Sequence, residues 1–131
     1  MVPGEIRIVV VDDEPALLES MRSYLSRVGY AVTAFLDAQL AWDYFAADPL
    51  ASSVIIVDLT LAGMSGQEFI RKVLHLKPDM AVLATSGYPP ALNKLLELRG
   101  ARLATLEKPF TPVMLTDALD RLLANQKAAP G

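Results

Sequence analysis

Short apolar runs alternate with longer amphipathic segments along the whole chain, and this alternation most constrains the fold. Residues 6–11 form a continuous run rich in β-branched side chains, which is typical of a strand buried on both faces. Residues 15–28 follow with apolar side chains at helical spacing, and Gly29 stands where a helix C-cap is expected. The apolar positions of this predicted helix are Leu17, Met21, Leu25 and Val28.

The same alternation predicts four more strands and four more helices. Ser65 and Glu68 have capping-box spacing, and Thr111 followed by Pro112 indicates another helix start. The predicted strands cover 31–35, 52–57, 80–85 and 103–107; the predicted helices run from 37 to 46 or 47, 65 to about 76, 89 to 100, and 111 to about 124. Strands that alternate with helices indicate a doubly wound, three-layer α/β fold, with a parallel sheet between helices and right-handed crossovers.

The chain has the length of one domain, with 131 residues. We expect the domain to cover residues 5–124 and residues 125–131 to form a C-terminal tail or the start of a linker. Residues 1–5 lack the charged and apolar regions of a signal peptide, and the apolar run that follows is too short to span a bilayer. A cytoplasmic protein without membrane association is therefore expected.

Composition excludes several kinds of chemistry. The chain has no Cys and one His, so disulfides, a thiol nucleophile, a cysteine zinc site and a paired-histidine metal site are excluded within it. A net charge of −3 argues against direct nucleic-acid binding, which needs clustered Lys and Arg. Any chemistry must come from carboxylates, hydroxyls and lysines.

Polar side chains of these three types follow four of the five predicted strands. Because the carboxyl ends of parallel strands meet at one edge of a sheet, we expect these side chains to converge there. They are Asp12, Asp13 and Glu14 after the first strand, Asp58 after the third, Ser86 after the fourth and Lys108 after the fifth.

Carboxylates gathered at one edge repel one another. Two unit charges about 4 Å apart cost on the order of 4 kcal/mol at an effective dielectric constant near 20. Protonation of one acid relieves this repulsion, and so does a hard divalent cation such as Mg²⁺, which prefers oxygen ligands. With Lys108 as a fixed positive charge, a hydroxyl from Ser86 and a carboxylate able to attack, the set suits a phosphoryl group.

From about residue 5 to residue 123, the sequence resembles the receiver domain of two-component response regulators. The segments that carry the resemblance are 8–14, 55–58, 63–66, 85–88 and 108–110. Each is weak alone, but the ordered set is specific. The resemblance implies a flavodoxin-like (βα)5 fold with strand order 2-1-3-4-5.

The resemblance also implies a role for each residue at the sheet edge. Asp58 would accept a phosphoryl group from a phosphohistidine on a sensor histidine kinase or a histidine phosphotransfer domain. Mg²⁺ would be held by Asp58, by Asp13 directly, by Asp12 largely through water, and by the backbone carbonyl of Thr60.

Two more residues would contact the phosphoryl group itself. The Ser86 hydroxyl would donate a hydrogen bond to a phosphoryl oxygen, and Lys108 would pair with the group through its ammonium. The Lys108–Pro109 peptide bond would be cis. A phosphorylated surface would then act on an output domain or effector protein, and a dimer is possible.

Three positions depart from the family pattern. Ala62 stands where members often have Pro, and Ser86 replaces the commoner Thr while keeping the hydroxyl. Thr105 stands where Tyr or Phe usually takes part in the switch. The aromatic part of that switch is therefore missing from this sequence.

Two alternative functions remain beside the phosphorylated receiver. A haloacid-dehalogenase-like phosphatase also uses an aspartyl nucleophile, a lysine and Mg²⁺, but it needs a second Asp where Thr60 stands. A receiver-like scaffold would bind partners without phosphorylation. In the receiver interpretation the chain is no enzyme in the usual sense, because phosphotransfer and autodephosphorylation act only on the domain itself.

Overall fold

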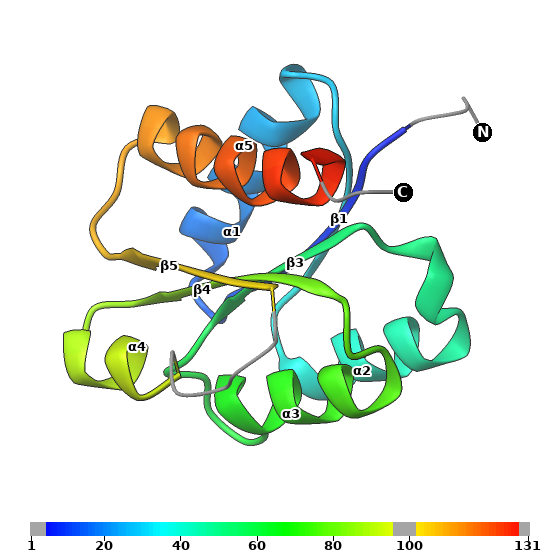
Figure 1. The fold of residues 1–131 in the computed structure, drawn as a ribbon. Helices are drawn as coiled ribbons and strands as arrows, with labels where there is room; N and C mark the ends of the chain where they lie inside the picture. The colour runs from blue at the N-terminus through cyan, green and yellow to red at the C-terminus, as the bar shows by residue number, and fades with distance from the viewer. Residues whose placement is uncertain (1–4, 96–101, 129–131) are drawn as a thin grey trace.

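The computed structural model describes residues 5–95 and 102–128, which form one five-stranded parallel sheet with helices on both faces (Figure 1). The strand order is β2-β1-β3-β4-β5. This confirms the doubly wound fold and the predicted order. The strands are β1 Arg7–Val11, β2 Ala31–Phe35, β3 Val54–Asp58, β4 Ala81–Ser86 and β5 Arg102–Glu107.

Five α-helices connect and cover the strands. Helices α1 and α5 pack on one face of the sheet, and α2, α3 and α4 pack on the other (Figure 1). The helices are α1 Pro15–Arg27, α2 Ala38–Ala47, α3 Gly66–Leu76, α4 Pro89–Leu95 and α5 Pro112–Ala128, with a short 3₁₀ turn, η1, at Pro49–Ala51.

Two apolar cores lie back to back across the sheet. Within β1, Val9 and Val11 face the core under α2 and α3, whereas Ile8 and Val10 face the core under α1 and α5. Every residue of β3 and β4 is buried, which explains why these strands read as continuous apolar runs. The edge strand β2 is only partly buried.

The helices differ from the sequence prediction in phase and length. Leu18, Met21 and Leu25 form the buried stripe of α1, whereas the predicted Val28 is 49% exposed because the helix ends before it. Helix α5 continues to Ala128, past the expected end near 124. The second half of the helix predicted for 89–100 lies outside the described residues.

The connection from β3 to α3 is tight, and this positions Asp58. The Ser65 hydroxyl caps α3 by accepting a hydrogen bond from the Glu68 amide at 3.1 Å, as the capping-box spacing predicts. At Gly66 a Cβ atom would lie 2.3 Å from the carbonyl oxygen of Asp58 and 2.6 Å from Leu59 Cα. Only glycine therefore allows the start of α3 to approach the end of β3 this closely.

Within residues 5–95 and 102–128, no helix is both long enough and apolar enough to cross a bilayer.

Candidate functional site

The strand register brings the predicted site residues to one edge of the sheet. Val11 pairs with Val57, so the residues that follow β1 stand beside Asp58 at the end of β3. Ser86 pairs with Glu107, so the end of β4 lies beside Lys108. The ends of these four strands thus lie side by side at one edge of the sheet, although they come from distant parts of the chain.

The ammonium group of Lys108 stands at the centre of this edge. Its Nζ atom lies 2.8 Å from Asp58 Oδ2, 2.9 Å from Asp12 Oδ2 and 3.2 Å from Glu14 Oε1. The side chains of Asp12 and Asp58 are 1% and 2% exposed, whereas that of Glu14 is 62% exposed. One cation therefore bridges two buried carboxylates and one on the surface.

The surroundings of Asp12 disfavour the ionised form of its carboxyl. Burial raises the pKa of its carboxyl above the usual range, and the negative charge of Asp58 acts in the same direction. Hydrogen bonds from the Glu14 amide to Oδ1, at 2.9 Å, and from Lys108 to Oδ2 offset only part of this. Asp12 is therefore the acid whose ionised form gains most from additional positive charge.

The pKa of Asp58 is shifted in the opposite direction. Burial alone would raise the pKa of its carboxyl, but hydrogen bonds from Lys108 and Thr60 outweigh burial and hold the pKa below its ordinary value. Thr60 donates both its amide, at 2.9 Å, and its hydroxyl, at 2.8 Å, to Oδ1. Asp58 is an ionised carboxylate, which is the form that can act as a nucleophile.

Lys108 remains charged at this site. Its burial disfavours the ammonium, but hydrogen bonds and charge interactions with Asp58 and Asp12 prevail and raise its pKa above the ordinary value. The Lys108–Pro109 peptide bond is cis, as the resemblance implies.

Ser86 is buried and is hydrogen-bonded within its own loop. Its Oγ accepts a hydrogen bond from the Tyr88 amide at 2.9 Å and lies 3.5 Å from the Tyr88 carbonyl oxygen, to which it donates. The hydroxyl thus lies at the end of β4, and Tyr88 itself is 61% exposed. Ser86 as a donor to a phosphoryl group stays a prediction.

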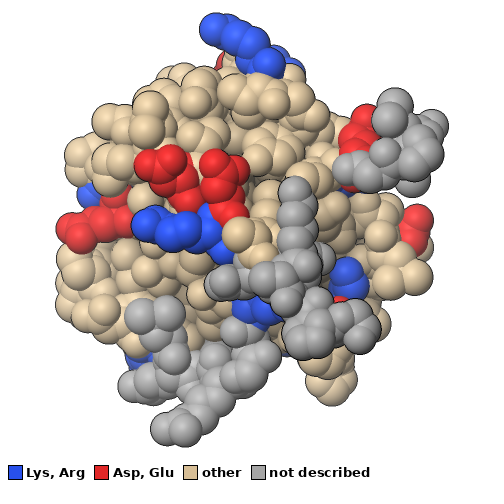
Figure 2. All heavy atoms as spheres, turned by 45° about the horizontal axis from the view of Figure 1, so that its top comes forward, with Lys and Arg blue, Asp and Glu red and all other residues tan. Residues whose placement is uncertain are grey.

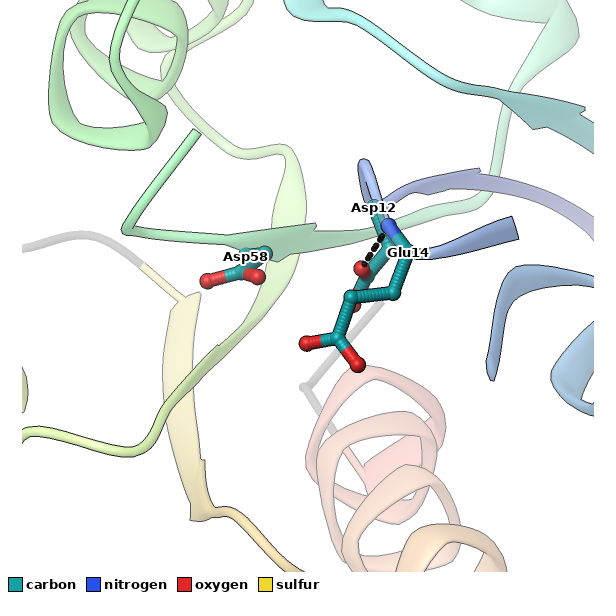
Figure 3. Close-up of side chains that lie close together, drawn as sticks. All are labelled: Asp12, Glu14 and Asp58. Carbon is teal, nitrogen blue, oxygen red and sulfur yellow. Dashed lines mark hydrogen bonds between the residues drawn. The ribbon is translucent and has the colours of Figure 1, made fainter. Parts of the chain in front are cut away.

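Three carboxylates at this edge offer oxygen donors of the kind that bind a divalent cation, and the Lys108 ammonium contacts all three. Carboxylate oxygens of Asp12, Glu14 and Asp58 all lie within 4.8 Å of one another (Figure 3). In the part of the chain that the structure describes, Asp13 is exposed and outside this group, so its predicted role as a direct ligand is untested. The same holds for the Thr60 carbonyl. Oxygen donors with a high negative charge are what Mg²⁺ prefers.

Sequence reasoning placed Glu14 at this edge but gave it no role. Its side chain is long and exposed, and its contact with Lys108 spans 94 residues of chain. One signal was present: Glu precedes Pro15 at the helix start, where the favoured capping residues are Ser, Thr, Asp and Asn.

Comparison with protein families gives one consistent answer. The profile of the family described as "Response regulator receiver domain" matches residues 8–120. The response regulator MprA of Mycolicibacterium vanbaalenii is 30% identical over 123 residues, which cover 94% of this chain and 49% of that protein. The transcriptional regulatory protein FixJ of Rhizobium meliloti is 28% identical over 120 residues, covering 92% and 58%. The chain thus spans about half the length of these curated relatives.

Solved structures agree with this result. A response regulator receiver domain protein from Clostridium thermocellum superposes with a TM-score of 0.83 at 26% identity, covering 93% of this chain and 97% of that one. The chemotaxis protein CheY4 of Vibrio cholerae gives a TM-score of 0.81 at 24% identity, covering 91% and 99%.

Proposed function

This chain belongs to the response regulator receiver domain family, and from that membership we propose that it accepts a phosphoryl group on Asp58. The observation that carries the proposal is the contact of the Lys108 ammonium with a buried, ionised Asp58 at 2.8 Å. A carboxylate beside a fixed cation, at the carboxyl ends of a parallel sheet, suits attack on an anionic phosphodonor.

The transfer is a displacement at phosphorus. An oxygen of the Asp58 carboxylate forms the new O–P bond while the P–N bond of a phosphohistidine breaks. The ring, protonated on its other nitrogen, leaves with the electron pair of that bond as a neutral imidazole, and the product is an acyl phosphate on Asp58. The carboxylate charge is then carried by the phosphoryl oxygens, to which Lys108 turns its ammonium and Ser86 its hydroxyl.

A Mg²⁺ ion held by Asp12, Asp13, Asp58 and the carbonyl of Thr60 would neutralise charge on the phosphoryl oxygens. Support comes from the raised pKa of Asp12, whose ionised form needs more positive charge than Lys108 supplies. The contacts that hold the two oxygens of Asp58 in place come from the protein itself. Thr60 fixes one oxygen of Asp58, and Lys108 stands beside the other.

The partners we propose are proteins. The phosphodonor is a sensor histidine kinase or a histidine phosphotransfer domain, and the phosphorylated surface acts on an output domain or an effector. On the face shown in Figure 2, the blue side chains stand in small groups, the most prominent of them directly beside red ones, and such mixed charge favours protein partners over nucleic acid. The domain has no external substrate, and its dephosphorylation is its own reaction with water.

Labelling with acetyl phosphate in the presence of Mg²⁺ tests this proposal. We expect the wild-type chain to gain one phosphoryl group in intact-mass spectra and Asp58→Asn to gain none, because the amide is a poor nucleophile. Asp48→Asn is the matched control, since Asp48 is an exposed aspartate. Undiminished labelling of Asp58→Asn would refute the assignment. Multiple turnover of a phosphate ester would instead favour the phosphatase alternative.

A further inference from the structure

Glu14 stands at the N-cap of α1 but does not cap the helix. Its backbone is extended, with φ −93° and ψ 105°, and its side chain makes no capping hydrogen bond. Its amide is fixed by donation to Asp12 Oδ1 at 2.9 Å, drawn as the dashed line in Figure 3. The carboxylate instead reaches Lys108, which belongs to the opposite end of the sequence.

With Glu14, the three N–H donors of the Lys108 ammonium are matched by three carboxylates. The three contacts differ in what phosphotransfer does to them. Asp58 becomes the acyl phosphate, and Asp12 belongs to the predicted cation site. Glu14, on the exposed side, takes part in neither bond making nor bond breaking.

We propose that Glu14 is a positioning residue that holds the Lys108 ammonium over the phosphoryl group during transfer. The inference rests on the proposed phosphorylation of Asp58. When the new O–P bond forms, the N–H that pointed to Asp58 Oδ2 turns to a phosphoryl oxygen. Glu14 retains its own contact throughout and keeps the lysine from swinging into solvent.

The contact itself is tested without phosphate or Mg²⁺. A ¹H–¹⁵N spectrum of the lysine ammonium groups should show a Lys108 signal, because this group is mostly buried and hydrogen-bonded. We expect Glu14→Gln to shift or broaden that signal and Glu19→Gln to leave it unchanged. Glu19 is the matched control, an exposed glutamate of the same helix whose partner is Arg22. An unchanged Lys108 signal in Glu14→Gln overturns the proposal.

The function of the contact is tested by phosphorylation rates at saturating Mg²⁺, where cation affinity no longer matters. We expect Glu14→Gln to phosphorylate about three- to fivefold more slowly with acetyl phosphate, the range of a partly exposed ion pair. Glu19→Gln should match the wild type. In a Lys108→Met background, Glu14→Gln should cause no further loss, because Glu14 acts through the lysine.

The outcomes distinguish a failure of this inference from a failure of the proposed function on which it rests. Equal rates for wild type and Glu14→Gln, or the same loss with and without Lys108, would overturn the role of Glu14 while Asp58 remained the acceptor. A wild-type chain that takes no label would overturn the proposed function itself.

Discussion

At the scale of single residues, Lys108 is what allows two buried carboxylates to share one edge of the sheet. Asp12 and Asp58 are almost fully buried, and each has one oxygen on the lysine. An ion bridge of this kind adds little to stability compared with an apolar core, but removing its cation leaves two unpaired buried charges. The contacts of Lys108 therefore matter for folding as well as for the proposed phosphotransfer.

Replacement of Lys108 by methionine should destabilise the fold in a pH-dependent way. Without the ammonium, the pKa of Asp58 should rise above the unfolded value near 4, and the pKa of Asp12, which burial already raises, should rise further. A raised carboxyl pKa contributes stability below the unfolded pKa, and that contribution is lost as pH rises. We expect Lys108→Met to be about 2–3 kcal/mol less stable than wild type in urea unfolding at pH 7, with the gap closing toward pH 4.

Lys94→Met provides the control for this measurement, because Lys94 is an exposed lysine on α4. Its free energy of unfolding should stay within about 0.5 kcal/mol of wild type. A Lys108→Met variant whose deficit is the same at pH 4 and pH 7 would show that the carboxylates are not the cause.

At the scale of elements, the close approach of α3 to β3 fixes the loop that carries Asp58 and Thr60. Gly66 begins α3 against the backbone of Asp58 and Leu59. A side chain at position 66 would therefore have no room, and the placement of Asp58 depends on this glycine.

Gly66→Ala should displace the loop and destabilise the protein. The added Cβ meets backbone atoms, which cannot move aside as a flexible side chain would. We expect a loss of about 1–3 kcal/mol in the free energy of unfolding and slower phosphorylation of Asp58. Gly87→Ala is the control for stability, since a Cβ there meets nothing within 4 Å. Equal stability of the two variants would contradict the crowding at Gly66.

Sequence patterns predicted the elements better than the details of the site. Buried runs and cap residues indicated every strand and most helix ends, because periodicity and capping are local. The predicted set of buried residues in α1 was partly wrong. Leu17 and Leu18 both fit an apolar stripe, and only packing selects Leu18. Side-chain direction is also set by tertiary contacts. For that reason neither the reach of Glu14 to Lys108 nor the hydrogen bonds of Ser86 to its own loop could be predicted.

At the scale of the whole molecule, one sheet separates two apolar cores. Ile8 lies in the core under α1 and α5, and Ile70 lies in the core under α2 and α3. Because the central strands contribute side chains to both cores, the two faces should unfold together.

Ile8→Val and Ile70→Val test that cooperativity. Each should cost about 1 kcal/mol, and the double variant should lose the sum to within about 0.5 kcal/mol. Trp42 is the single tryptophan and packs on the face of Ile70. Within each variant, we expect Trp42 fluorescence and far-UV circular dichroism to give the same unfolding midpoint. A Trp42 transition unmoved by Ile8→Val would mean that the two faces unfold separately.

The central claim is that Asp58 carries the phosphoryl group, and mapping the acyl phosphate tests it most directly. Borohydride reduces an aspartyl phosphate to homoserine, which tandem mass spectrometry locates in the sequence. After treatment with acetyl phosphate and Mg²⁺, we expect homoserine at position 58 and at no other aspartate. Homoserine at position 12 or 13 would contradict the account. So would a wild-type chain that contains no homoserine after this treatment.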